Sequence, residues 1–135
     1  MTSPFLLREV SIVAPAAKHI YPSPDENKLG IWDFDHSSVI YCLISTDDGK
    51  TFCDTPARVT VNAARNQDVM QEPGILELPN GVMWMWIRTD RCYQYECFSM
   101  DNMKRFTTPE PSIFTSACSP MGIYNAGNGV LYTVY

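Results

Sequence analysis

The sequence lacks the long apolar run that a membrane-spanning helix requires. No stretch approaches the roughly 18 consecutive apolar residues of such a helix, so we expect no membrane partner. The first residues include several apolar side chains, but Arg8 and Glu9 interrupt them before they can form the core of a secretion signal. No export signal is visible, and the sequence predicts a cytoplasmic protein if Met1 is the true start.

Basic residues are also scarce. Ten Lys and Arg stand against fifteen Asp and Glu, which gives a formal net charge of -5. Proteins that bind nucleic acid displace phosphate counterions with Lys and Arg clustered on one face. The basic residues here are scattered among the acidic ones, so we expect neither a nucleic-acid partner nor binding to anionic lipid.

The cysteines have neither the spacing of a metal site nor the even number of a disulfide framework. There are five of them, and no CxxC pair or Cys/His ligand spacing occurs. We therefore expect no metal, no cofactor and no catalytic cysteine. The expectation is five buried free thiols, with a Cys92–Cys97 disulfide as the open alternative: Cys42, Cys53, Cys92, Cys97 and Cys118.

What the sequence does contain is the pattern of an all-β protein. Hydrophobic residues make up 45% and charged residues 19%, a globular composition. Ten prolines and seven glycines separate short runs rich in Val, Ile, Tyr, Phe and Trp, and no run has the periodicity of an amphipathic helix. We expect strands at 9–14, 38–45, 57–62, 74–78, 82–88, 93–99, 112–115, 121–124 and 130–135.

Two internal similarities give the chain a repeat of about 50 residues. PGILELPNGVMWMW, from Pro73, matches PMGIYNAGNGVLYTVY, from Pro120, and their Asn-Gly pairs stand 48 residues apart. STDDGKTF, residues 45–52, matches SMDNMKRF, residues 99–106, at a distance of 54. A repeat of this length with about four strands has the size of a propeller blade.

The expected strand 82–88 is apolar on both faces. Val82, Trp84 and Trp86 alternate with Met83, Met85 and Ile87, shown by the run VMWMWI. A sheet with one solvated face would alternate polar and apolar residues. The pattern therefore favours a blade packed between two neighbours, with the tryptophans in its core.

The octapeptide Ser45–Phe52 fits the pattern S-x-D-x-G-x-T-W/F. In a tight turn Asp47 can accept backbone N–H bonds, Gly49 supplies positive φ, Ser45 and Thr51 can bond neighbouring backbone, and Phe52 would pack back into the blade. The octapeptide resembles the Asp box, or BNR repeat, of the sialidase superfamily, where it is structural. Residues 99–106 would be a degenerate box.

The stretch from Gln71 to Tyr135 carries a second and sharper resemblance to the same family. QEPGILELPNGVMWMWIRTDRCYQYECFSMD is similar to a sialidase segment in which Glu-Pro precedes a strand, a turn, a second strand and an Arg. The resemblance implies that Glu72 is the base paired with a nucleophilic tyrosine, and that Arg88, 16 residues on, binds the substrate carboxylate. Arg91, three residues after Arg88, is the alternative candidate for the carboxylate-binding arginine.

The other catalytic groups of the family have no match in this sequence. The first and third arginines, the acid/base Asp and the nucleophilic tyrosine cannot be aligned. Tyr93, Tyr95 and Tyr124 are not at the family's nucleophile position and are therefore interpreted as packing residues. Asp33, Asp35 and Asp68 are candidates for the acid by chemistry alone.

The resemblance implies an all-β fold, a partial β-propeller of sialidase type with two to three four-stranded antiparallel blades. We expect a single domain, 1–135, with blade boundaries near 1–55, 56–110 and an incomplete 111–135. A propeller of five or six blades needs roughly 250–300 residues. The chain is therefore interpreted as a fragment, with closure by oligomerisation or a smaller β-domain as alternatives.

The function implied is that of an exo-α-sialidase-type glycoside hydrolase with a glycan or sialoside partner. The isolated chain is expected to be inactive because it lacks part of the site. A non-catalytic propeller module that binds glycans or protein, and a glycosidase of the same fold acting on another sugar, are the alternatives.

Overall fold

The computed structural model describes residues 5–6, 11–20, 37–60, 70–116, 118–127 and 129–134. Every regular element within these ranges is a β-strand, as the all-β composition predicts. In the same ranges no helix is present that could cross a lipid bilayer. The polar, Pro-containing stretch 19–30 predicts a loop, and this prediction is wrong for His19 and Ile20, which end the strand Ile12–Ile20. Residues 21–30 and the acid candidates Asp33, Asp35 and Asp68 lie outside the described residues.

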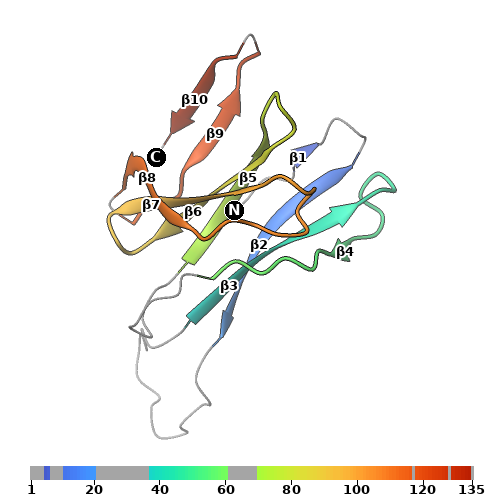
Figure 1. Ribbon diagram of the computed structural model, residues 1–135, viewed down its shortest axis with the longest axis horizontal. Coiled ribbons are helices and arrows are strands. Elements are labelled where there is room, and N and C mark those ends of the chain that lie inside the picture. The colour runs from blue at the N-terminus through green and yellow to red at the C-terminus, as the bar shows by residue number, and fades with distance from the viewer. Residues whose placement is uncertain are drawn as a thin grey trace, which may run out of the picture.

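The strands form antiparallel sheets in which sequence neighbours are also spatial neighbours (Figure 1). The first sheet contains β1 (Phe5–Leu6), β2 (Ile12–Ile20), β3 (Ser37–Ser45) and β4 (Cys53–Asp54). The second contains β5 (Met70–Glu77), β6 (Met83–Thr89), β7 (Tyr93–Ser99) and β8 (Glu110–Thr115). The third is the hairpin of β9 (Gly122–Asn125) and β10 (Leu131–Val134).

Three of the expected strands differ from those observed by more than two residues. The strand expected at 74–78 is β5, which begins at Met70. The strand expected at 9–14 begins at Ile12 and continues to Ile20. The strand expected at 57–62 does not form over its described part, where Val59 makes only an isolated bridge to Ile40. Within the described residues 57–60, Val59 is buried against the core but pairs at this single position, so its β propensity is satisfied by burial without a strand.

The repeated hairpins share the hydrogen bond that closes each turn. Leu78 N–H donates to the Val82 carbonyl at 2.8 Å, and 48 residues later Ala126 N–H donates to the Val130 carbonyl at 3.0 Å. The second residue of each Asn-Gly pair has positive φ, 82° at Gly81 and 81° at Gly129. The internal similarity in the sequence therefore marks a structural repeat: β9 and β10 correspond to β5 and β6.

The octapeptide turn at 45–52 is closed by side-chain hydrogen bonds. The Asp47 carboxylate accepts from Thr51 N–H at 2.9 Å and from the Thr51 hydroxyl at 2.6 Å. Ser45 Oγ accepts from Gly49 N–H at 2.8 Å, and Gly49 has a φ of 81°. Each residue type singled out in the sequence, except Phe52, therefore has a contact in the turn that requires it.

The turn at 99–106 has the same geometry with different residues. The Asp101 carboxylate accepts from Arg105 N–H and from Arg105 Nε, both at 2.9 Å, so a guanidinium replaces the threonine hydroxyl. Met103 occupies the glycine position at a φ of 61° and is fully buried. Left-handed backbone costs a non-glycine residue about 1–2 kcal/mol. Burial of a methionine side chain offsets that cost, because it contributes about 1.5–3 kcal/mol.

The aromatic residues that end the two turns have different surroundings. Phe52 is 42% exposed, so the prediction that it packs back into the blade is wrong. Phe106, its counterpart, is partly buried against the core. In the first turn the strand that follows is only Cys53–Asp54, and this short strand does not cover the ring.

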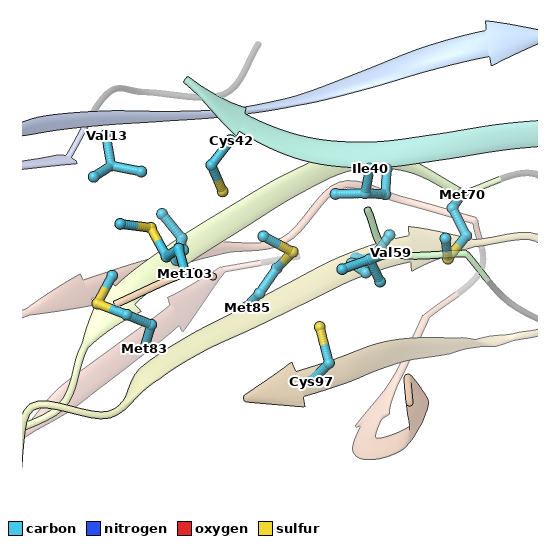
Figure 2. Packing of buried hydrophobic residues seen from close by; sticks show 11 residues of the cluster. Val13, Ile40, Cys42, Val59, Met70, Met83, Met85, Cys97 and Met103 are labelled. Atoms are coloured by element: carbon cyan, nitrogen blue, oxygen red, sulfur yellow. The ribbon is translucent and has the colours of Figure 1, made fainter. Parts of the chain in front are cut away.

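The principal core lies between the first and second sheets (Figure 2). Its members project from β2 and β3 on one side and from β5, β6 and β7 on the other: Val13, Ile40, Cys42, Met70, Ile75, Met83, Met85, Ile87 and Cys97, with Val59 and Met103 from connecting segments. β5 lies against both β2 and β3, which places it at the junction of the two sheets. Burial of this apolar surface holds the sheets face to face.

The opposite face of the second sheet is also buried. Trp84 and Trp86 of β6 pack there with Leu76 and Met121 and form a second buried cluster. The alternate residues of the same strand, Met83, Met85 and Ile87, face the principal core. The prediction that both tryptophans are blade core is confirmed. A four-stranded antiparallel sheet covered on both faces is the arrangement of a propeller blade, and the chain has the all-β fold of a partial propeller.

We expect Met85→Ala to destabilise the protein by about 2–5 kcal/mol, because Met85 is fully buried between the sheets. Met100→Ala is the matched control, since Met100 is 78% exposed, and it should change stability by less than about 0.5 kcal/mol. Urea unfolding of both variants measures the difference. Equal losses of unfolding free energy in the two variants would contradict the burial of Met85 in the principal core.

The two turn aspartates should make stability depend on acid pH. Hydrogen bonds, from Thr51 in the first turn and from Arg105 in the second, lower the pKa of Asp47 and of Asp101 to about 2. Because the unfolded carboxyl titrates near 3.9, this stabilisation is complete above about pH 4 and is lost as the pH falls toward 2.

Asp47→Asn should therefore lower the free energy of unfolding at pH 7 more than at pH 2.5, as measured by thermal melts across this range. Asp48→Asn is the control, because asparagine tolerates the φ of 58° found there. If Asp47→Asn lowers the free energy of unfolding by the same amount at both pH values, the charge of the Asp47 carboxylate does not contribute to stability.

Candidate functional site

The structure brings Glu72 and Arg88 into direct contact. Arg88 Nη1 donates to Glu72 Oε2 at 2.7 Å, and the two side chains are 24% and 32% exposed for Arg88 and Glu72 respectively. Glu72 lies on β5 and Arg88 on β6, so the hairpin between these strands brings together two residues that are 16 apart in sequence. They share one half-buried location at the end of the blade.

A β-bulge in β5 orients Glu72. Gln71 pairs with Arg88 and Gly74 pairs with Trp86, so Glu72 and Pro73 together stand opposite the single residue Ile87. Glu72 has a φ of 47°, which few non-glycine residues adopt. Such a conformation costs about 1–3 kcal/mol and is found most often where function requires it.

The two residues after Glu72 fit the bulge for separate reasons. Pro73 is fully buried and has no N–H group, so it leaves no donor without a partner where the ladder is interrupted. Gly74 lies directly against the Trp86 indole, and a Cβ at this position would overlap the ring. The Glu-Pro-Gly sequence therefore allows the bulge, which displaces the Glu72 carboxylate from the regular strand geometry.

Arg88 has a second partner from a distant part of the chain. Its Nη2 donates to Cys118 Sγ at 3.4 Å, 30 residues along the sequence. The hydrogen bond to Glu72, followed by that to Cys118, raises the pKa of Arg88 above its ordinary value. The guanidinium is therefore charged at neutral pH.

Side chains of the second sheet hold the connector that carries Cys118. Trp86 Nε1 donates to the Met121 carbonyl at 2.7 Å, and Gln94 Nε2 donates to the Ser119 carbonyl at 2.7 Å. Ser119 N–H also donates to Ser116 Oγ at 3.0 Å. Gln94 is a fully buried polar residue on β7, and its role here is to fix residues 118–121 over the end of the blade.

Sequence reasoning missed Cys118 and Gln94. Both belong to no recognisable motif, and each acts through a contact that joins residues at least 25 apart. The available signal was a glutamine between two tyrosines in an expected strand, because a polar side chain buried there needs hydrogen-bond partners. Nothing in the sequence indicates which partners it has.

The structure pairs Glu72 with Arg88, not with the alternative Arg91. The Arg91 guanidinium lies near the Tyr95 hydroxyl, with Nη1 at 3.5 Å from the oxygen. Arg91 is in the turn between β6 and β7, beyond the end of the β6 ladder. Arg88 is within that ladder, opposite Gln71, and this register directs it to Glu72.

Several side chains expected in the core are exposed instead. Tyr95 is buried, but Tyr93 is 43% and Tyr124 65% exposed, so the packing predicted for these two is wrong. Cys42 and Cys97 are buried free thiols, and burial raises the pKa of each to about 12. The expectation of burial fails at the other three, which lie in turns and at a short edge strand: Cys53, Cys92 and Cys118, all free and exposed.

The geometry suits recognition of an anion beside a carboxylate. A guanidinium has five N–H donors in a planar fork. Among the described residues, Glu72 and Cys118 are the partners of Arg88, and each takes one N–H group. Donors therefore remain for a ligand. The described residues include no group of three or more His, Cys, Asp and Glu side chains that could hold a metal ion.

Comparison with known proteins gives a structural likeness and no sequence match. No protein-family model matches the chain, and no curated protein matches it. A protein of unknown function from Dyadobacter fermentans superposes with a TM-score of 0.74 at 20% identity over 96% of this chain. The intramolecular trans-sialidase of Ruminococcus gnavus, solved with oseltamivir carboxylate, gives 0.57 at 14% identity over 93%.

A leech intramolecular trans-sialidase complexed with 2,7-anhydro-Neu5Ac gives the same TM-score of 0.57 at 14% identity. The chain spans 32%, 22% and 16% of the lengths of these three proteins, in the order given. At such identities the likeness concerns the fold. The chain is an all-β, partial propeller-like structure of sialidase type, with a distant structural similarity to sialidase-type proteins.

The bulge makes a prediction about substitutions at Glu72. Alanine and glycine both remove the ion pair with Arg88, but only glycine adopts a φ of 47° without strain. We expect Glu72→Gly to be more stable than Glu72→Ala by about 1 kcal/mol, which reverses the usual order in a strand. Chemical unfolding measures the difference, and the normal order, alanine above glycine, would argue against the bulge.

Proposed function

We propose that this chain contributes the Glu72–Arg88 pair to the active site of a sialidase-like glycoside hydrolase of the exo-α-sialidase type. The observation that carries the proposal is the 2.7 Å contact between the two side chains at the bulged end of β5. The two residues were assigned to one site from the sequence alone, and their contact depends on a β-bulge that the sequence pattern does not specify. The sialidase-type fold supports the assignment.

Arg88 would bind the carboxylate of the substrate. Sialic acid is a permanent anion at neutral pH, and a guanidinium recognises a carboxylate with two parallel N–H bonds. Oseltamivir carboxylate and 2,7-anhydro-Neu5Ac, the ligands of the two trans-sialidases, agree with such a subsite. In this protein the anion would approach the donors of Arg88 that Glu72 and Cys118 leave open.

Glu72 would serve as the base for a nucleophilic tyrosine. A carboxylate nucleophile facing an anionic substrate would be repelled, whereas a tyrosine activated by a neighbouring glutamate is not. No residue of this sequence is assigned as that tyrosine or as the acid/base group. The hydrolysis therefore requires residues besides the pair described, and activity belongs to the complete site.

We expect Glu72→Gln, which removes the base, and Arg88→Ala, which removes the partner of the substrate carboxylate, each to lower kcat/KM for a fluorogenic sialoside by at least about 100-fold. Hydrolysis is measured with the purified full-length protein. Arg58→Ala is the matched control, because Arg58 forms an ion pair with Asp54 away from this location, and it should leave kcat/KM within about twofold.

Hydrolysis that neither substitution affects would contradict the proposed site. Binding of N-acetylneuraminic acid without hydrolysis, lost in Arg88→Ala, would instead support the non-catalytic glycan-binding alternative. Hydrolysis of another glycoside that depends on both residues would support the proposed site and the alternative of a glycosidase that acts on another sugar.

A further inference from the structure

Cys118 enters the site from a segment that the proposed function does not use. It lies in the connector between β8 and β9, and its Sγ is 3.4 Å from Arg88 Nη2. Glu72 binds the other terminal nitrogen, Nη1. The guanidinium is thus held at both ends of its fork, by residues from two separate parts of the chain, and its rotation about the side chain is restricted.

The position of Cys118 is fixed by its surroundings. Residues 118–121 are tied to β6 by the Trp86 indole and to β7 by the buried Gln94 amide, both at 2.7 Å. Cys118 itself has a φ of 60°, a left-handed conformation that neighbouring contacts must maintain. Cys118 is nevertheless exposed, so a small reagent can reach its thiol beside Arg88.

We propose that Cys118 is a positioning residue of a carboxylate subsite: its thiol accepts from Arg88 Nη2 and, with Glu72, sets the plane in which the guanidinium presents its remaining donors. The inference rests on the proposed function for the identity of the sugar. The subsite itself requires only a small carboxylate that binds at Arg88 beside an accessible sulfur.

A carboxylate-bearing alkylating reagent tests this arrangement without any sialoside. In the reaction the Cys118 sulfur displaces iodide from iodoacetate, forming an S–C bond while the C–I bond breaks, and the thiol proton passes to buffer. Iodoacetamide reacts by the same path without the charge. The ratio of the two rates at Cys118, read by peptide mass spectrometry, therefore isolates the attraction of Arg88 for a carboxylate.

We expect this rate ratio at Cys118 to fall about fivefold in Arg88→Gln, the factor that corresponds to a single ion pair at the protein surface. It should be unchanged in Arg58→Gln, and the ratio at the exposed Cys53 should be the same in wild type and Arg88→Gln. A ratio at Cys118 that does not respond to Arg88→Gln would overturn the proposal.

The positioning role has its own variants. Cys118→Ala removes the acceptor, and we expect it to weaken binding of N-acetylneuraminic acid about tenfold, whereas Cys118→Ser keeps an acceptor and should restore most of the affinity. Equal affinity of wild type and Cys118→Ala, in proteins with the same melting temperature, would overturn the positioning role.

Protection experiments separate this inference from the proposed function. N-acetylneuraminic acid that slows alkylation of Cys118 supports both. An iodoacetate preference that depends on Arg88, together with no protection by this sugar and no sialoside hydrolysis, supports the carboxylate subsite and contradicts the sialidase assignment. Hydrolysis that depends on Arg88, with no iodoacetate preference and no effect of Cys118→Ala, supports the sialidase assignment and contradicts the role of Cys118 in a carboxylate subsite.

Discussion

Burial of both faces of β6 is the constraint on which the rest of the structure depends. Met85 and its neighbours on one face pack against the first sheet, and Trp84 and Trp86 on the other pack toward β9. A strand apolar on both sides is stable only when sheets cover both sides. This requirement places the first and third sheets against the second, and so brings the connector with Cys118 next to β6.

The site geometry follows from that packing. Trp86 contributes its ring to the apolar cluster and its N–H group to the Met121 carbonyl, so one side chain packs the sheet face and holds the connector. The same ring leaves no room for a side chain at position 74, where glycine follows the bulge. The bulge turns Glu72 toward Arg88. Core packing and site geometry are thus coupled through Trp86.

The paired turns illustrate how one backbone geometry arises from different residues. Both use a serine hydroxyl and an aspartate carboxylate to accept N–H bonds, and both require positive φ four residues after the serine. Glycine meets this requirement in the first turn, whereas buried Met103 meets it in the second through its packing. The sequence pattern therefore identified the second turn correctly even though its glycine is absent.

The amino-acid sequence by itself determined the all-β class, the 48-residue hairpin repeat and the burial of both faces of β6, because each depends on local periodicity or on turn residues. A family resemblance assigned Glu72 and Arg88 to one site, but their contact depends on the bulge in β5, which the sequence pattern does not specify. Tertiary structure alone decided the exposure of Phe52, Tyr93 and Tyr124 and the approach of Cys118 to Arg88. Burial and long-range contacts depend on which sheet covers which face, and residue spacing along one strand contains no information about that neighbour.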